Sequence, residues 1–226
     1  MVSAASPGGR PGAAAPPASP RRRDAAATHA LLLRTAERLF AERGVHAVSN
    51  RRIAEAAGQG SNSAVGYHIG TKADLVAEII RAHAVPMDRM RERMLVRAER
   101  SPDPRARIAC LVVPVTRHLA ELGVPSWYAR FAAQISVDPG LRTVAVNEAT
   151  STPAMRRTMD AVLACVPGEA ASLRAGMVRH LIIHTCADRE QELADGNAPA
   201  TGTWPRTGAL LIDAIAALLA AREDPA

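Results

Sequence analysis

Helical periodicity constrains this chain more than any other feature, because its apolar residues recur every three to four positions from residue 28 onward. Leu32, Ala36, Leu39 and Phe40 share one face of a predicted helix over 28–43, which Gly44 terminates. No stretch alternates with the period of a strand. Further helices are expected at 49–57, 62–68, 72 to about 99, 104–122, 126–137, 139–149, 153–165, 168–194 and 206–222. The pattern predicts an all-α fold.

The N-terminal end differs in composition from the rest of the chain. Residues 1–27 consist almost entirely of Ala, Pro, Gly, Ser and Arg, and such a segment buries too little apolar surface to order itself, so we expect a disordered basic tail. Of the formal net charge of +6, five units fall before residue 84, where a polyanionic partner would bind. Arg21, Arg22 and Arg23 could lie along phosphates, or the tail could simply be solubilising.

Residues 49–68 have the spacing of a helix-turn-helix, with two short helices joined by a turn over 58–61. The second helix begins with small polar residues that leave room to approach base edges. Lys72 brings the only lysine of the chain to a helix start, which suits a phosphate, although it could also be a solvated helix start. The candidate DNA-binding residues are Ser49, Arg51, Arg52, Ser61, Asn62, Ser63, Tyr67, His68, Thr71 and Lys72.

Several short motifs occur together in the run RTAERLFAERGVHAVSNRRIAEAAGQGSNSAVGYHIGTKADLVAEIIRAH, residues 34–83. They are LF and ERG closing the first helix, IAEAAG in the second, a tyrosine-histidine pair near the end of the third, and Gly-Thr-Lys followed by Asp and Leu. With these motifs the segment resembles the DNA-binding domain of the TetR family of transcriptional regulators. It departs from the usual pattern at Ile69, where the family commonly has Phe, and in a glycine turn that is one residue longer.

The resemblance implies a ligand-responsive regulator that binds a pseudo-palindromic operator as a homodimer and acts as a repressor that a small-molecule effector releases. It implies a DNA-binding domain over 28–83 and a larger helical domain for effector binding and dimerisation over 84–226. It implies no enzymatic activity and no cofactor. The net charge near zero beyond residue 83 argues against the alternative of a sequence-neutral, DNA-compacting protein.

The last two long helices are the expected dimer interface, because members of this family pair them into a four-helix bundle. Their apolar stripes could equally be buried inside one subunit. The stripe residues are Leu173, Met177, Leu181 and Ile182 in the first helix and Leu211, Ile215, Leu218 and Leu219 in the second.

A cluster of aromatic residues marks the expected effector site. Aromatic residues make up only 3% of the chain, yet three of them fall between Trp127 and Phe131. Trp and Tyr combine apolar area with a polar group, as a small-molecule pocket requires, although ordinary core packing is the alternative. The candidate effector-binding residues are Trp127, Tyr128, Phe131, Gln134, Met177, His180 and His184. Met87, Met90 and Met94 are expected in the core, with an adaptable cavity wall as the alternative.

His180 and His184 lie one helical turn apart, a spacing that would also suit two metal ligands. The alternative function is therefore a helical metallo-enzyme, with His118 or Cys186 as the third ligand. The sequence has no HExxH, no GxSxG and no phosphate-binding glycine loop, so no metal site is expected. Three cysteines without a CxxC pair, and the lack of a signal peptide or membrane span, lead us to expect a cytoplasmic protein.

Overall fold

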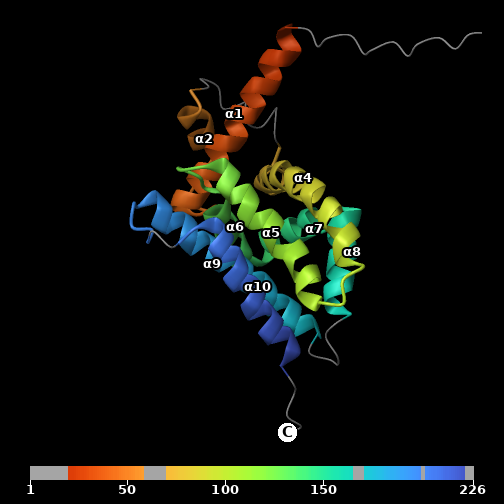
Figure 1. Ribbon diagram of the computed structural model, residues 1–226. Helices are drawn as coiled ribbons and strands as arrows, with labels where there is room; N and C mark the ends of the chain where they lie inside the picture. Colours follow the sequence, from red (N-terminus) through yellow and green to blue (C-terminus); the bar gives the residue numbers. More distant parts are fainter. Residues whose placement is uncertain (1–19, 59–69, 165–170, 200–201, 222–226) are drawn as a thin grey trace, which may run out of the picture.

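Helices form all of the regular structure in the described part of the chain, which in this computed structural model is residues 20–58, 70–164, 171–199 and 202–221. They are α1 (Pro20–Arg43), α2 (Asn50–Ala56), α4 (Lys72–Ala98), α5 (Pro104–Leu122), α6 (Tyr128–Ser136), α7 (Pro139–Ala149), α8 (Pro153–Leu163), α9 (Ala171–Ala194) and α10 (Trp204–Ala220). The helices α1 and α2 stand at one end of the molecule, and α9 and α10 run side by side (Figure 1). The all-α prediction is confirmed, while the expected helix at 62–68 lies outside the described residues.

Three helix starts follow from a two-residue signal in the sequence. Asp103, Asp138 and Thr152 each precede a proline, and each accepts a hydrogen bond from a backbone N–H of the first turn. The proline occupies a position where the backbone N–H would have no helical partner, and its fixed φ suits the helix. The predicted starts at 104, 139 and 153 are therefore confirmed.

The first helix begins earlier than the sequence indicates. Periodicity predicts a start at Thr28, after a disordered tail, but α1 starts at Pro20, so residues 20–27 are helical and are not part of a disordered tail. Alanine has the highest helix propensity and needs no buried face to be helical, and Ala25–Ala27 continue directly into the buried stripe that starts at Leu32. Low hydrophobicity is therefore a poor guide to disorder here. Residues 1–19 lie outside the described residues.

A side chain from another helix caps the start of α6. Trp127 occupies the N-cap position of α6 and makes no side-chain cap hydrogen bond. Glu190 on α9 instead accepts hydrogen bonds from the backbone N–H groups of Ala129 (3.3 Å) and Arg130 (3.0 Å), and from the hydroxyl of Ser126 (2.8 Å). A buried carboxylate is favoured at the positive end of a helix. This contact fixes α6, and with it the aromatic cluster, against α9.

One apolar core joins the N-terminal helices to the rest of the molecule. The rings of Phe40 on α1 and Phe131 on α6 stack with centroids 6.2 Å apart, and both side chains are fully buried. The helix α4 continues through Pro86 without interruption, so it belongs both to the end that carries α1 and α2 and to the larger helical part. The two parts are therefore connected by shared packing and by one continuous helix.

Candidate DNA interface and effector cavity

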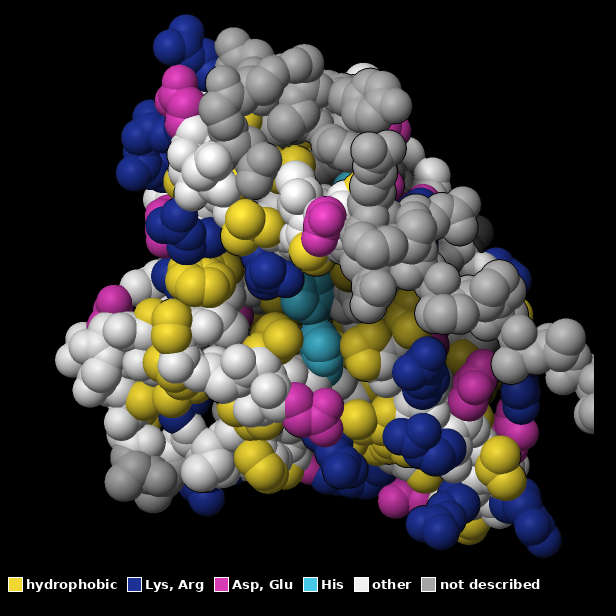
Figure 2. All heavy atoms as spheres, turned by 90° about the horizontal axis from the view of Figure 1, so that it is seen from above, with side chains coloured by type: hydrophobic (Ala, Val, Ile, Leu, Met, Phe, Trp, Pro, Cys, Tyr) yellow, Lys and Arg dark blue, Asp and Glu magenta, His cyan; other side chains and the backbone are white. Residues whose placement is uncertain are grey.

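Two arginines are exposed on α2, the first short helix of the expected helix-turn-helix. The hydroxyl of Ser49 accepts a hydrogen bond from the Arg52 backbone N–H (3.2 Å), which caps the helix. Arg51 donates from Nε to Glu55 (2.7 Å), one turn along, and Arg52 is also exposed. Seen from above, some Lys and Arg side chains lie along the edge of the molecule on the side where α2 lies, and others lie on the opposite side of the same face (Figure 2). The two arginines thus lie where a polyanion can reach them.

The first turn of α4 is held by its own polar side chains. The hydroxyl of Thr71 accepts from the Asp74 backbone N–H (3.2 Å), while the Thr71 backbone N–H donates to the Asp74 carboxylate (2.8 Å), which completes a capping box. These hydrogen bonds lower the pKa of Asp74. Lys72 Nζ donates to the carbonyl oxygens of Val45 (2.8 Å) and His46 (3.5 Å), so it ties α4 to the segment that follows α1.

Several of the candidate DNA-binding residues therefore already have structural partners. Ser49 stabilises the start of α2, and Thr71 and Lys72 stabilise the start of α4. Contact of these three residues with DNA stays a prediction. The candidates of the second short helix lie outside the described residues; they are Ser61, Asn62, Ser63, Tyr67 and His68.

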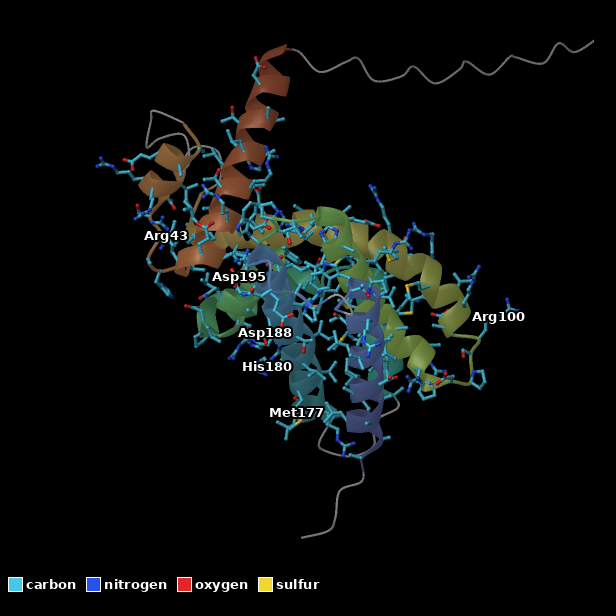
Figure 3. All side chains as sticks on the ribbon, turned by 60° about the vertical axis from the view of Figure 1, so that its left-hand side comes forward. Arg43, Arg100, Met177, His180, Asp188 and Asp195 are labelled. Carbon is cyan, nitrogen blue, oxygen red and sulfur yellow. The ribbon has the colours of Figure 1, made fainter. Side chains whose placement is uncertain are left out.

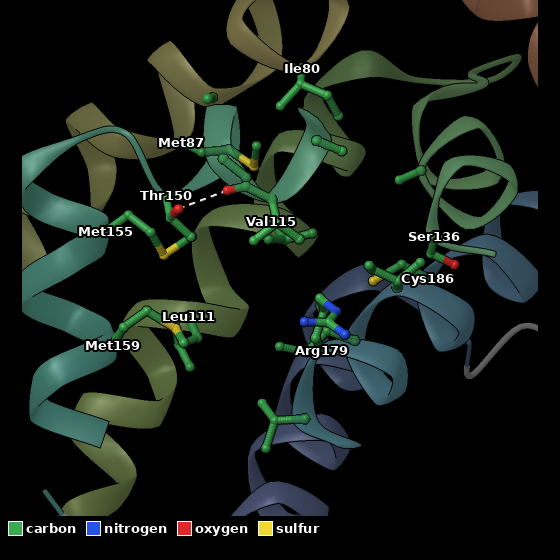
Figure 4. A pocket seen from close by; sticks show the side chains of 18 of the residues that line it. Ile80, Met87, Leu111, Val115, Ser136, Thr150, Met155, Met159, Arg179 and Cys186 are labelled. Carbon is green, nitrogen blue, oxygen red and sulfur yellow. Dashed lines mark hydrogen bonds between the residues drawn. The ribbon is translucent and has the colours of Figure 1, made fainter. Parts of the chain in front are cut away.

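A cavity of about 270 Å³ opens between α4, α5, α6, α7, α8 and α9. This volume lies just below the ~300–1,000 Å³ typical of small-molecule sites. Its wall is mostly apolar, with methionines on both α4 and α8, and no carboxylate lines it within the described residues. Figure 4 shows Met155 and Met159 on the α8 side and Arg179 on the α9 side. Labelled wall residues in that view are Ile80, Met87, Leu111, Val115, Ser136, Thr150, Met155, Met159, Arg179 and Cys186.

Most polar groups of the cavity wall are already bonded within the protein. The hydroxyls of Thr150 and Ser136 donate to the backbone carbonyls of Val146 (2.7 Å) and Ala133 (2.8 Å). Burial raises the pKa of the Cys186 thiol to about 12, which keeps it neutral. Among the wall residues, the Nε of Arg179 is an exception, because it is buried and has no partner within the described residues.

The expected aromatic cluster contributes one residue to this cavity. Tyr128 lines the wall, while Phe131 is fully buried against Phe40 and Trp127 packs at the start of α6. Gln134 lies beside Gly44, just after the C-terminal end of α1: its Oε1 is 3.6 Å from the point that a Cβ would occupy if residue 44 had a side chain. The cluster therefore divides between the cavity wall and the contact with α1.

The expected effector residues on α9 do not line the cavity. Met177, His180 and His184 are exposed and do not line the wall. Desolvation first, and then the positive charge of Arg179, lower the pKa of His180, so its ring lies within electrostatic reach of the cavity's arginine. These three residues therefore lie outside the wall of this cavity, and their role in effector binding stays a prediction.

The residues that do line the cavity from α9 form a stripe that the sequence analysis missed. Ala175, Val178, Ile182 and Cys186 recur at helical spacing, and Arg179 interrupts this apolar face. A charged residue within an otherwise buried stripe was the available signal, since an isolated charge is rarely buried without a function or a partner.

A polar network connects the cavity wall to α1. His83 on α4 bonds through Nδ1 to His118 Nε2 (2.7 Å) and through Nε2 to the Glu37 carboxylate on α1 (3.0 Å). The His83 ring stacks on Tyr128, with centroids 3.8 Å apart. Burial and the nearby His83 lower the pKa of His118 to about 4, so His118 is neutral at pH 7.

The two α9 histidines lack the surroundings of a metal site. Their ring centroids are 6.0 Å apart and both side chains are exposed. His118 is bonded to His83, and Cys186 is buried in the cavity wall. Within the described residues no three His, Cys, Asp or Glu side chains come together to hold a metal ion. No described helix is both long and apolar enough to cross a membrane.

Comparison with known proteins matches the N-terminal helices to a known domain. Residues 32–79 match the family model for bacterial regulatory proteins of the TetR family. Among curated proteins, none matches this sequence. One similar solved structure is described as a putative TetR-family transcriptional regulator from Mesorhizobium loti, with 16% identity and a TM-score of 0.47 over 87% of this chain and 96% of that chain. Another is the TetR-family transcriptional regulator PfmR from Thermus thermophilus, with 18% identity and a TM-score of 0.44 over 87% of this chain and 97% of that chain.

The domain match covers most of the buried face of α1, all of α2 and the first turns of α4. These are the elements that present the exposed arginines and that Lys72 holds together. Residues 32–79 therefore resemble the DNA-binding domain of TetR-family regulators, and this domain match supports a DNA-binding transcriptional regulator.

Proposed function

We propose that this protein is a dimeric repressor that binds a pseudo-palindromic operator and releases it when a small molecule occupies the cavity between α4 and α9. In this proposal residues 28–83 bind DNA, and residues 84–226 bind the effector and form the dimer. The observation that carries the proposal is the continuity of α4, which begins in the DNA-binding part and lines the cavity farther along.

The path from the cavity to the DNA-binding part runs first along α4. Its first turn is tied by Lys72 to the segment after α1. About two to four turns later, Ile80, Ala84 and Met87 line the cavity. A ligand that pushes on these side chains acts on the same rigid helix that positions α1 and α2. Since packed helices shift as units, a small displacement at the cavity changes the spacing of the two DNA-binding parts in a dimer.

A second path runs through the aromatic and histidine contacts. Tyr128 lines the cavity and stacks on His83, which bonds to Glu37 on α1. An effector that displaces Tyr128 therefore alters a polar contact with α1. The effector shifts the equilibrium only by the difference in its affinity for the two states, and a few kcal/mol is enough to change operator occupancy strongly.

The outer faces of α9 and α10 are the proposed dimer interface. Leu173 and Met177 on α9 and Leu210 on α10 are exposed apolar side chains. Figure 3 shows Met177, His180 and Asp188 along α9 and Asp195 just after its end, and all four residues are exposed. Leu211, Ile215 and Leu219 are instead buried within the subunit, so the exposed residues beside them would make the contact.

Operator contacts are proposed for the helix-turn-helix and for the start of α4. Arg51 and Arg52 are exposed on α2 and suit phosphates. Lys72 and the residues of the second short helix remain proposed contacts.

The test is a binding titration with the full-length protein. Genomic fragments, starting with the DNA next to its own gene, are selected on the protein, and the selected site is measured by fluorescence anisotropy at several salt concentrations. We expect one discrete site, competition by unlabelled site but not by random duplex, and a logarithm of affinity that falls linearly with the logarithm of salt concentration. A selection that yields no discrete site would contradict the proposal.

A further inference from the structure

The cavity wall contains three arginines, and only one of them is neutralised within the described part of the protein. Arg91 is buried, pairs with Asp88 and donates from Nε to the Cys110 carbonyl (3.1 Å). Arg142 and Arg179 also line the cavity, but within the described residues neither has an acidic partner. The same cavity is therefore lined by one arginine that has an acidic partner and by two that have none within the described residues.

The Arg179 side chain reaches the cavity with an unsatisfied donor. Its Nε is buried and has no hydrogen-bond partner in the described structure. Leaving a charged donor buried without a partner costs more than the ~1–3 kcal/mol of a neutral group. The hydroxyls of Thr150 and Ser136 are committed to backbone carbonyls, and Arg179 and Arg142 are the charged wall residues left to recognise a ligand.

We propose that the effector is a small molecule with one carboxylate on an apolar body, and that Arg179, assisted by Arg142, binds the carboxylate while the methionine-rich wall covers the rest. This inference rests on the proposed function, because it names the ligand class of the same cavity.

The chemistry of the wall favours an anion over the alternatives. A guanidinium presents a planar set of donors that matches a carboxylate in two parallel hydrogen bonds. A cationic ligand would meet two arginines and, among the described wall residues, no carboxylate. A neutral apolar ligand would leave Arg179 Nε unpaired and exclude the water that otherwise reaches the rest of that side chain. The methionines Met87, Met155 and Met159 can adapt to the shape of an alkyl or aromatic body.

The experiment compares ligands that differ only in the head group. The neutral dye N-phenyl-1-naphthylamine reports on the cavity of the full-length protein, and decanoate, decan-1-ol and decylammonium compete for it below their micelle concentrations. We expect decanoate to displace the dye at least about tenfold more tightly than decan-1-ol, and decylammonium to be the weakest.

Three variants assign the head group to its partner. Arg179→Met should weaken decanoate about tenfold or more, with the dye and decan-1-ol unchanged, and Arg142→Met should have a smaller effect in the same direction. Arg93→Met, on an exposed position of α4 outside the cavity, is the matched control for net charge and should change nothing. Thermal unfolding of each variant verifies folding, and Arg179→Gln replaces Arg179→Met if the latter fails to fold.

Equal affinity for decanoate and decan-1-ol, an unchanged decanoate affinity in Arg179→Met, or no binding of any of these molecules would overturn the inference. Operator binding by the ligand-free protein is measured separately. A protein that binds its operator but does not distinguish the head groups refutes only the ligand class. A protein that binds decanoate through Arg179 but no discrete DNA site refutes the proposed function and leaves the ligand class intact.

Discussion

The first turn of α4 and the α9 wall of the cavity use polar side chains in opposite ways. At the first turn, Thr71, Lys72 and Asp74 are bonded to one another or to the segment after α1. At the cavity, the Arg179 guanidinium retains a buried donor without a partner among the described residues. The polar groups at the first turn of α4 are paired within the chain and hold its shape, whereas Arg179, unpaired at a cavity, is the proposed contact for a ligand. The difference predicts that substitutions in closed polar contacts reduce stability, while substitutions of Arg179 reduce ligand affinity.

The largest loss of stability is expected at Glu190, the most enclosed carboxylate in these networks. Glu190→Ala removes the cap of α6 and leaves Arg130 without its buried partner, which should lower the free energy of unfolding by about 3–5 kcal/mol. Urea unfolding of the full-length protein measures this. Glu121→Ala, which removes the exposed partner of the exposed Arg117, is the control and should cost under ~1 kcal/mol. Equal losses for the two variants would contradict the role of Glu190 as a cap.

Acidification should weaken the protein through His118. Its pKa is about 4 in the folded protein and 6.5 when exposed, so the unfolded chain binds more protons between these values. The stability that the neutral His118 contributes is therefore fully present above pH 6.5. As the pH falls from 6.5 to about 4, the free energy of unfolding decreases by roughly 1.4 kcal/mol per pH unit.

The measurement is unfolding free energy against pH for the natural protein and for His118→Gln, which does not titrate and can still bond to His83. The variant should show a smaller loss over this range. Parallel pH profiles for the two proteins would refute the assignment to His118.

An intermediate effect is expected at Lys72, which combines a structural and a proposed DNA-binding role. Lys72→Ala removes the ammonium that bonds to the Val45 carbonyl and should lower the free energy of unfolding by about 1–2 kcal/mol as well as weaken operator binding. If Lys72→Ala leaves both stability and operator affinity unchanged, Lys72 neither stabilises the first turn of α4 nor contacts the operator.

Arg52→Ala, at an exposed position, should weaken operator binding and reduce the slope of log affinity against log salt concentration by about one, without changing stability. The same operator assay applies to Tyr67→Ala, which should weaken binding and leave the protein folded.

The smallest effect on stability is expected at Arg179. Arg179→Met removes a buried donor that has no partner within the described residues, so the free energy of unfolding without ligand should stay the same or rise. Differential scanning fluorimetry with and without decanoate measures this directly. A large loss of stability in the ligand-free variant would mean that Arg179 is a structural residue. Arg179 would then resemble the paired residues of the first turn of α4 instead of differing from them.

Local sequence signals predicted the helices well and the faces of the helices less well. The starts of α5, α7 and α8 were predicted correctly, and each has a capping residue followed by proline, two signals that act within a single turn. The start of α1 was missed because alanine-rich segments are helical without an apolar face. On α9, Met177 was expected at the effector site, whereas Arg179 lines the cavity two residues later. Two residues correspond to about half a helical turn, so Met177 and Arg179 lie on opposite sides of α9. Because α9 has apolar residues on both sides, helical periodicity does not tell which side lines the cavity.

By itself, the sequence determined an all-α chain with a TetR-family DNA-binding domain at its N-terminal end, because helix periodicity, caps and short motifs are local properties. Only the tertiary structure decided that Glu190 caps a helix 60 residues away, that Tyr128 alone of the aromatic cluster lines the cavity, and that Arg179 reaches it unpaired. Pairing and burial depend on which helices pack together. No local pattern along the chain contains that information.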